Sequence, residues 1–525
     1  MRYFSAPLAL ALLCLMPACN RDGPEENSAE AVRISLLNSP EFTTTQALEG
    51  GAALATAATQ TSLLSIDASG QLQPGLAQSW RVSNDGRSYI FRLGKATWSD
   101  GRAITAGDVV AILRRAVAPG STHPLKAYLM AIENAPAIAR NRKPARMLGV
   151  QDIRADILEI RLHAPMPEFL HLLALPAMAI QRKGEPLVAS GPYQIRTQSA
   201  DRLILRANND KSSAAAAHPP LHLQRSSDAA TALQQMQQGQ IDMILNGGVD
   251  GLSAARTAGP GAQLLIEPSY GLYGYAMRSI DGPLSDVRVR RALNMALDRP
   301  TLVARLFSVP ALQPTSLPVP PALLEDSQTD IADTMITTAH SARLAEAQAL
   351  LAEAGYGPSH PLQLDIALPR AQVHRDILAV VAQDWAPLGV ELHISVRSDA
   401  DHARTLTRGS FDLALVQWQS PLALVPMFLE QYRCQKALGG YCNRTADQWL
   451  DAGWTSTDLA SRNSQWRTAI SLYMADVPVI MLFQPVRWHL IAPDISGLQA
   501  NITGQHPLAA ISRKAPRARL SVLKK

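Results

Sequence analysis

The sequence lacks the short motifs that mark the commonest enzyme active sites. It contains no GxSxG nucleophile elbow, no HExxH zinc motif, no GxxxxGKS/T phosphate loop and no GxGxxG dinucleotide fingerprint. Its twelve histidines are scattered, and an isolated histidine is more often structural or exposed than catalytic. These absences favour a protein that is not an enzyme and that holds neither a metal nor another cofactor.

A basic surface suited to nucleic acid is also missing. The formal net charge is +5, but residues 513–525 contain six lysines and arginines and no acid, so the rest of the chain carries −1. No stretch interleaves aromatic with basic residues, as nucleic-acid binding modules do. We expect no nucleic-acid partner, and we expect residues 513–525 to be a solvated basic tail, with contact to anionic lipid or a partner as the alternative.

Cysteine is scarce, with four residues in 525. Cys14 and Cys19 lie in an N-terminal segment that is expected to be processed, which leaves Cys434 and Cys442 in the folded protein. Seven residues separate this pair, two of them adjacent glycines. A disulfide that closes a small surface loop is favoured over two free thiols, and a zinc site is disfavoured because no further Cys or His ligands lie near the pair.

The N-terminus has the features of an export signal. A positive charge precedes an apolar run at residues 4–16, which is shorter than the roughly 18 residues that a membrane-spanning helix needs. Cys19 follows the small Ala18, and the segment resembles a bacterial lipoprotein signal in which Cys19 becomes the lipid-modified first residue. Ordinary cleavage after Ala18 is the alternative. Residues 1–18 are thus predicted to be a signal peptide, and residues 19–31 a polar tether outside the cytosol.

Residues 75–110 contain a dense set of strand, turn and helix signals. Residues 80–82 and 89–93 alternate apolar and polar side chains, as half-buried strands do, and Asn-Asp-Gly between them predicts a hairpin turn. Thr105 occupies an N-cap position before the apolar residues of a predicted helix. This order of hairpin, turn and capped helix resembles the corresponding part of the periplasmic oligopeptide-binding proteins.

Further blocks along the chain extend that resemblance. They are KPARMLGVQDI from Lys143, SGPYQI from Ser190, QQGQIDMI from Gln237, DVRVRRALNMALDR from Asp286, LLAEAGYG from Leu350, LGVELHI from Leu388, GSFDLALVQW from Gly409 and DVPVIMLF from Asp476. The blocks are collinear with the family and cover nearly all of the chain after about residue 34. On these motifs the sequence resembles the bacterial extracellular solute-binding proteins, family 5, which include the oligopeptide receptors of peptide ABC importers.

The resemblance implies an α/β fold of the periplasmic-binding-protein type II, in which two lobes close about a hinge, with an extra α+β domain. The length agrees, because 525 residues exceed one ordinary core. The implied domains are lobe I at 32–66, 186–280 and 484–512, the extra domain II at 67–185, and lobe III at 281–483. Closure of the lobes on a ligand, followed by recognition of the closed form by a permease, would be the mechanism.

The resemblance also implies four candidate ligand-binding residues. Trp418 matches a pocket tryptophan of the family, with a core aromatic as the alternative, and His374 aligns with a pocket histidine, with a surface histidine as the alternative. Tyr128 lies where relatives carry a pocket tyrosine. Glu49 lies where relatives place an acid on the first lobe. It is the best candidate partner for a ligand amine, with a charge at a helix start as the alternative.

The sequence departs from its relatives where the ends of a peptide would bind. Relatives carry an aspartate after the pocket tryptophan that pairs with the peptide amine, whereas no acid occurs here between Asp412 and Glu430. The arginine that relatives place shortly before the tryptophan aligns with Leu415. Both charged ends of a short peptide therefore lose an expected partner.

The leading hypothesis is an extracytoplasmic receptor that captures oligopeptides and delivers them to an ABC permease with its ATPase subunits. Main-chain hydrogen bonds to an extended peptide would then carry the affinity. We expect a monomer in the periplasm, anchored to a membrane by lipid on Cys19. The alternatives are a relative that binds a less polar or non-peptide solute, and a lipoprotein with a structural or sensory role.

Overall fold

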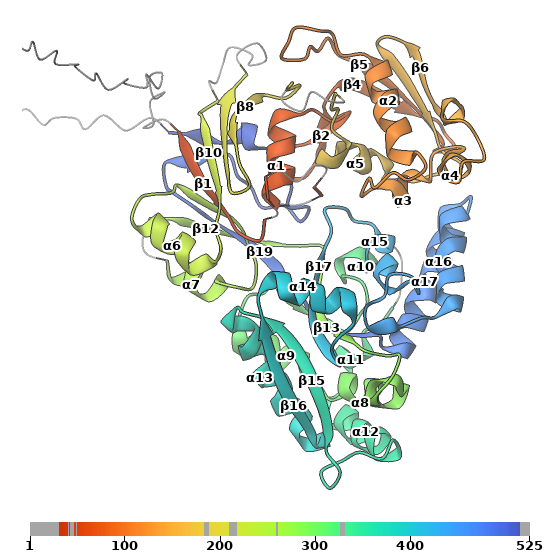
Figure 1. The fold of residues 1–525 in the computed structure, drawn as a ribbon, viewed down its shortest axis with the longest axis vertical. Helices are drawn as coiled ribbons and strands as arrows, with labels where there is room; N and C mark the ends of the chain where they lie inside the picture. Colours follow the sequence, from red (N-terminus) through yellow and green to blue (C-terminus); the bar gives the residue numbers. More distant parts are fainter. Residues whose placement is uncertain are drawn as a thin grey trace, which may run out of the picture.

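The computed structural model contains two large mixed sheets, one above the other in Figure 1, and a smaller sheet beside the upper one. It describes residues 31–39, 41–42, 47–48, 50–182, 188–208, 218–258, 261–325 and 331–514. The large sheets form lobes I and III, and the small sheet forms domain II. The predicted α/β architecture of two lobes with an extra α+β domain is confirmed.

Seven strands form the lobe I sheet, in the order β12-β19-β11-β1-β10-β9-β8. Their bounds are β1 (Val32–Leu36), β8 (Tyr193–Gln198), β9 (Arg202–Ala207), β10 (Leu221–Arg225), β11 (Met243–Gly247), β12 (Gln263–Pro268) and β19 (Val486–Ile491). β1 runs parallel to β10 and β11, and the outer pairs are antiparallel. α1 (Gly50–Thr59) packs on one face, and α6 (Ala229–Gln237) and α7 (Leu252–Thr257) pack on the other. The central strand is therefore buried on both faces, as its apolar composition requires.

Domain II is a four-stranded antiparallel sheet, β4-β5-β7-β6, with α2 packed against it. Its elements are β4 (Ala77–Val82), β5 (Ser88–Leu93), β6 (Val150–Arg154), β7 (Ile157–Arg161), α2 (Ala106–Val117), α3 (Lys126–Leu129), α4 (Ala135–Ala139) and α5 (Phe169–Ala174). The pairing of β4 with β5 confirms the predicted hairpin. α2 begins after Thr105 as predicted, and the Asp108 carboxylate accepts hydrogen bonds from the Thr105 N–H and hydroxyl at 2.8 and 2.9 Å.

Six strands form the lobe III sheet, in the order β14-β18-β13-β17-β15-β16. Their bounds are β13 (Gly271–Met277), β14 (Gln313–Pro314), β15 (Leu362–Pro369), β16 (Val390–Arg397), β17 (Leu413–Gln419) and β18 (Val479–Gln484). β15 is parallel to β16 and β17, and the other pairs are antiparallel.

The helices of lobe III cover this sheet and extend towards domain II in Figure 1. They are α8 (Val287–Met295), α9 (Arg299–Leu306), α10 (Ala322–Glu325), α11 (Thr334–Thr337), α12 (His340–Glu353), α13 (Gln372–Trp385), α14 (Asp399–Arg408), α15 (Val425–Leu429), α16 (Arg444–Thr455) and α17 (Leu459–Asp476). The predicted helix that starts after Asp286 is confirmed as α8, and the Asp286 carboxylate caps it by accepting from the Arg288 N–H at 2.8 Å. Within the described residues no helix combines the length and the apolar character needed to cross a membrane.

The two large sheets are joined by two short strand crossings. Residues 269–270 link β12 to β13, and Pro485 alone links β18 to β19. β12 pairs with β19 in lobe I, and β13 pairs with β18 in lobe III. At the crossing, Ser269 Oγ donates to the Pro485 carbonyl at 2.8 Å, and Gln484 Nε2 donates to the Ser269 carbonyl at 2.9 Å. The two crossings are therefore hydrogen-bonded to each other and form a single hinge.

Three predicted boundaries are wrong. β13 falls within the 186–280 segment assigned to lobe I, but it pairs in the lobe III sheet because the chain changes sheets directly after β12. The hairpin of β2 (Leu64–Ile66) and β3 (Leu72–Pro74) spans the expected border between lobe I and domain II.

The third boundary concerns the basic tail. Arg513 was expected to begin a solvated segment, but its guanidinium pairs with Asp242 at 2.9 Å and also with Asp494. It lies in β21 (Ser512–Arg513), which pairs with β20 (Ile495–Ser496). Two acids of lobe I thus hold this arginine against the domain, and residues 515–525 lie outside the described part of the chain.

Cys434 and Cys442 form a disulfide in the structure, with Cα atoms 4.2 Å apart. We predict that the oxidised protein is lighter than the reduced protein by the two thiol hydrogens, measured by intact mass spectrometry. Closing so short a loop restricts the unfolded chain, so C434S/C442S should lower the free energy of unfolding by about 2–3 kcal/mol in urea titrations. Labelling of two free thiols in protein purified without reductant would contradict the disulfide.

Candidate ligand-binding site between the lobes

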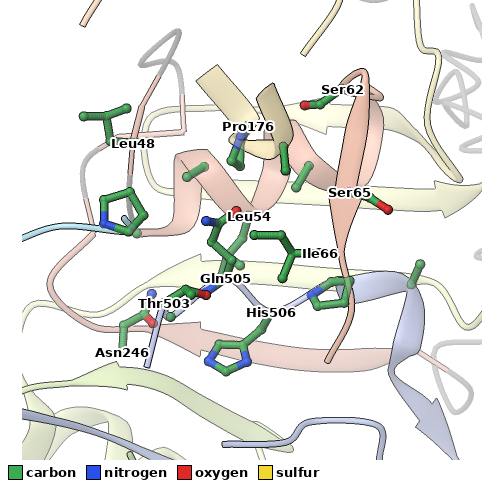
Figure 2. A pocket seen from close by; sticks show the side chains of 18 of the residues that line it. Leu48, Leu54, Ser62, Ser65, Ile66, Pro176, Asn246, Thr503, Gln505 and His506 are labelled. Atoms are coloured by element: carbon green, nitrogen blue, oxygen red, sulfur yellow. The ribbon is translucent and has the colours of Figure 1, made fainter. Parts of the chain in front are cut away.

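A cavity of about 660 Å³ lies where lobe I, domain II and lobe III meet. Lobe I supplies most of the wall through α1, the end of β11 and the segment 503–509, and the β2–β3 hairpin at its border with domain II adds to it. Domain II and lobe III supply Ala174, Pro176, Gln417, Gln419 and Pro421. Figure 2 shows side chains from α1, β2 and the C-terminal segment converging on this space, with Leu54, Ile66 and Gln505 near its centre.

Neutral groups make up most of the polar lining. They are the amides of Asn38, Gln60, Asn246, Gln417, Gln419 and Gln505 and the hydroxyls of Thr61, Ser62, Ser65 and Thr503. Among the lining residues that the structure describes, none is Asp, Glu or Lys, and only Arg487 and His506 can carry a charge. Such a wall can donate and accept hydrogen bonds along a polar ligand and has apolar surface for its other groups.

Directly after Asn246, two glycines at the end of β11 bring bare main chain to the cavity. Gly247 and Gly248 both line the space, and a Cβ on Gly247 would come within 2.0 Å of the Trp488 ring. The Trp488 indole N–H donates to the Gly248 carbonyl at 2.7 Å. Because only glycine permits this close packing, this corner presents peptide groups to a ligand.

Strand β17 points alternate side chains into the cavity. Gln417 and Gln419 are exposed and line it, while the alternation places Trp418 on the opposite face of the strand. Trp418 packs edge-on against Tyr432, with ring centroids 5.3 Å apart. Trp418 therefore does not line the cavity as expected. Its neighbours Gln417 and Gln419 line it instead.

His374 lies in the core of lobe III and does not line the cavity. It is buried on α13, and its Nδ1 lies 2.9 Å from the Tyr273 hydroxyl on β13. Burial lowers the pKa of His374 to about 4. The sequence predicted either a pocket histidine or a surface histidine. His374 is instead a neutral histidine in the core of lobe III.

Tyr128 is also absent from the lining and lies in a contact between domain II and lobe III. It is buried on α3, and its ring packs against Trp454 of α16 with centroids 5.7 Å apart. Burial raises the pKa of Tyr128 well above its usual value. Tyr128 therefore helps to hold domain II against lobe III.

Two further predicted residues lie outside the described part of the chain. Cys19 belongs to the segment 1–30, and Glu49 falls between Leu48 and Gly50, which both line the cavity. Of the four predicted ligand residues, the three that the structure describes (Tyr128, His374 and Trp418) do not line the cavity, and the described lining consists mainly of residues that the sequence did not suggest.

A buried ionic cluster supports the wall at Arg487 and His506. Glu267 on β12 is 0% exposed, and its Oε1 accepts hydrogen bonds from Arg487 Nε at 2.9 Å and His506 Nε2 at 3.2 Å and lies 3.3 Å from His489 Nε2. Its Oε2 accepts from the Asn501 N–H at 2.8 Å. Burial opposes the charge of Glu267, but the neighbouring imidazoles of His489 and His506 hold its pKa far below the usual range. Glu267 therefore remains a carboxylate inside the protein.

Sequence reasoning missed this cluster because its members are far apart in the chain. Arg487 and Glu267 are separated by 220 residues. The available signal was the pattern Arg487-x-His489 in an apolar strand, since residues two apart share one face of a strand. Two such side chains on one buried face need an acidic partner. The sequence does not show which acid that is.

The cluster has the residue types of a metal site, but its geometry suits an ion pair better. Potential ligand atoms of Glu267, His489 and His506 all lie within 4.8 Å of one another. A cation there would lie beside the Arg487 guanidinium, whose Nε contacts the same carboxylate oxygen. His489 Nδ1 accepts from the Asn246 N–H at 3.3 Å, which leaves its Nε2–H to face Glu267.

The fold and the cavity between two hinged lobes define a solute-binding protein of the type II class. A family model described as "Bacterial extracellular solute-binding proteins, family 5 Middle" matches residues 71–438. The chain belongs to this family, as the sequence blocks predicted. The matching relatives are binding proteins and not enzymes.

Relatives and solved structures extend the likeness over most of the chain. The probable deoxycholate-binding periplasmic protein of Escherichia coli strain K12 is 26% identical over 83% of this chain and 84% of the relative. The periplasmic oligopeptide-binding protein of Salmonella typhimurium is 26% identical over 85% of this chain and 84% of the relative. The structure of the murein tripeptide-binding protein of Escherichia coli has a TM-score of 0.78 at 24% identity, covering 92% of this chain and 98% of that one.

The core position of His374 predicts a pH dependence of stability. The folded protein keeps His374 neutral down to a pH of about 4, whereas an unfolded histidine takes up a proton near pH 6.5. Between these values the unfolded state binds more protons, so the free energy of unfolding falls as the pH falls. H374Q should reduce this slope by up to about 1.4 kcal/mol per pH unit, measured by urea titration from pH 7 to 4.

The control for this experiment is H360Q, which changes an exposed histidine of lobe III. It should leave the slope unchanged. An equal slope in wild type and H374Q would show that His374 is accessible to protons in the folded protein.

Proposed function

We propose that this chain is the extracytoplasmic binding component of an ABC importer and that it captures oligopeptides by closing two lobes. The observation that carries the proposal is the cavity shared by lobe I, domain II and lobe III beside a hinge of two strand crossings. Its amides, hydroxyls and bare peptide groups suit a ligand with many main-chain hydrogen-bonding groups and variable side chains. The relatives that bind oligopeptides and murein peptides support the same ligand class.

Closure is supported by contacts between domain II and lobe III on the side away from the hinge (Figure 1). Arg462 on α17 pairs with Glu168 at 3.2 Å, and His163 Nε2 donates to the Trp454 carbonyl on α16 at 3.1 Å. Together with the edge-on packing of Tyr128 against Trp454, these contacts would break if the lobes separated about the hinge. We call the Arg462–Glu168 ion pair the clasp.

The closed form would be the one that a permease with its ATPase subunits accepts. In this proposal the protein acts as a monomer in the periplasm, and lipid attached to Cys19 holds it at a membrane. The periplasmic names of the relatives support the compartment, and the sequence of residues 1–19 supports the lipid anchor.

Glu49 is proposed as the partner of a ligand amine. Its chain neighbours Leu48 and Gly50 both line the cavity, and no described lining residue supplies another acid. An ammonium group that enters this cavity loses its hydrating water. Without a counter-charge, nothing would compensate for that loss.

Native mass spectrometry of the protein purified without its first eighteen residues tests the ligand class. Gentle denaturation should release a heterogeneous set of short peptides, and E49Q should retain about tenfold less of them because the amine loses its counter-charge. E41Q, a nearby change outside the cavity lining, is the control and should retain the wild-type amount. Release of one non-peptide compound would contradict peptide reception, and equal retention by E49Q would remove Glu49 from the site.

Solution X-ray scattering of the ligand-free protein tests closure. E168Q/R462Q should populate the open form more than wild type does and should therefore have a larger radius of gyration, because the clasp no longer opposes lobe separation. E133Q/R161Q removes an ion pair of 3.1 Å inside domain II and should leave the radius unchanged. The same radius in all three proteins, with and without ligand, would contradict a closing receptor.

A further inference from the structure

Arg487 is the side chain that gives the cavity wall a positive charge. It extends from β19, its side chain is 6% exposed, and it belongs to the cavity lining. Its Nε donates to Glu267 at 2.9 Å, and its Nη2 donates to the carbonyls of Ile502 and Asn501 at 2.7 and 3.4 Å. Among the described residues, none accepts a hydrogen bond from Nη1. One nitrogen of a nearly buried guanidinium in the wall is therefore available to a ligand.

The surroundings of Arg487 hold the guanidinium in place. A Cβ on Gly504 would lie 2.3 Å from Arg487 Cζ, so the glycine backbone packs directly on the guanidinium and a larger residue would displace it. Glu267 and the two carbonyls fix the other edges. A ligand group that met Nη1 would therefore find a donor that is already ordered, which reduces the entropy lost on binding.

Glu267 does not compete for that free nitrogen, because other donors occupy its oxygens. Oε1 receives Arg487 Nε and His506 Nε2, with His489 Nε2 at 3.3 Å, and Oε2 receives the Asn501 N–H. The described lining supplies no second carboxylate. A carboxylate is the natural partner for a guanidinium N–H that no protein group has satisfied.

We propose that Arg487 binds a carboxylate of the ligand and that Glu267 positions Arg487 for this contact. The cavity then selects solutes that carry an acidic group, either the free carboxyl end of a peptide or the acid of a compact apolar solute. This proposal rests on the proposed function, since it specifies the ligand class of the same cavity. The contact then lies on lobe I, whereas the resemblance to the family places a carboxylate-binding arginine at the position of Leu415 in lobe III.

Two pairs of probes test the proposal by isothermal titration calorimetry at pH 7. The first pair is trialanine and trialanine amide, and the second is deoxycholate and its uncharged methyl ester. We expect at least one of the acids to bind about 10- to 100-fold more tightly than its neutral analogue, and R487Q to abolish that preference.

R487Q leaves Glu267 buried with fewer donors, so its folding must be checked by thermal denaturation. The double variant E267Q/R487Q removes both charges together, should fold more stably than R487Q, and should show the same loss of acid preference. R33Q is the matched control, because Arg33 pairs with Asp242 at 2.8 Å in the same sheet and does not line the cavity. It should keep the wild-type preference.

The outcomes separate this inference from the proposed function. If neither acid binds more tightly than its neutral analogue, Arg487 is not a carboxylate site, and peptide reception still stands if trialanine and its amide both bind. If only deoxycholate binds, and R487Q weakens it, the carboxylate site stands and peptide reception fails. If neither acid binds, or if folded E267Q/R487Q keeps the acid preference, the inference is overturned.

Discussion

The hydrogen-bonded pair of strand crossings is the constraint on which the arrangement of the lobes depends. Two strand pairs pass from one sheet to the other, and Ser269 ties them together through Pro485 and Gln484. Such short links leave the lobes little freedom to slide, but the few torsions at 269–270 and 485 allow them to rotate. The cavity lies beside these links and takes its wall from both lobes, so the same constraint that joins the lobes also determines the shape of the site.

The hinge also accounts for the position of the ionic cluster. Glu267 precedes one crossing and Arg487 follows the other, so the antiparallel pairing of β12 with β19 places them opposite each other. A charge buried at this depth needs close partners, and Arg487, the histidines and Asn501 supply them around Glu267. Among the described lining residues Arg487 is the one with a permanent charge, and the amides and hydroxyls around it are neutral.

Local patterns predicted the elements well, whereas side-chain roles inferred from alignment were less reliable. The Asn-Asp-Gly hairpin and the helices after Thr105 and Asp286 were found as expected, because turn chemistry and capping act over a few residues. Trp418 was placed on the correct strand, but the strand's alternation turns it towards Tyr432, and its neighbours Gln417 and Gln419 face the cavity. His374 was placed on the correct helix, yet it packs against Tyr273 in the core.

The sequence by itself determined the family, the two-lobe fold, the hairpin and caps of domain II, and the loss of acids around Trp418. These features depend on short motifs, on their order along the chain and on composition. Only the tertiary structure decided that β13 belongs to lobe III, that Arg513 is held by Asp242 and Asp494, and that Glu267 meets Arg487 across 220 residues. The physical reason is that strand pairing and buried ion pairs join residues by their position in space, and periodicity within one segment carries no information about the segment that will lie beside it.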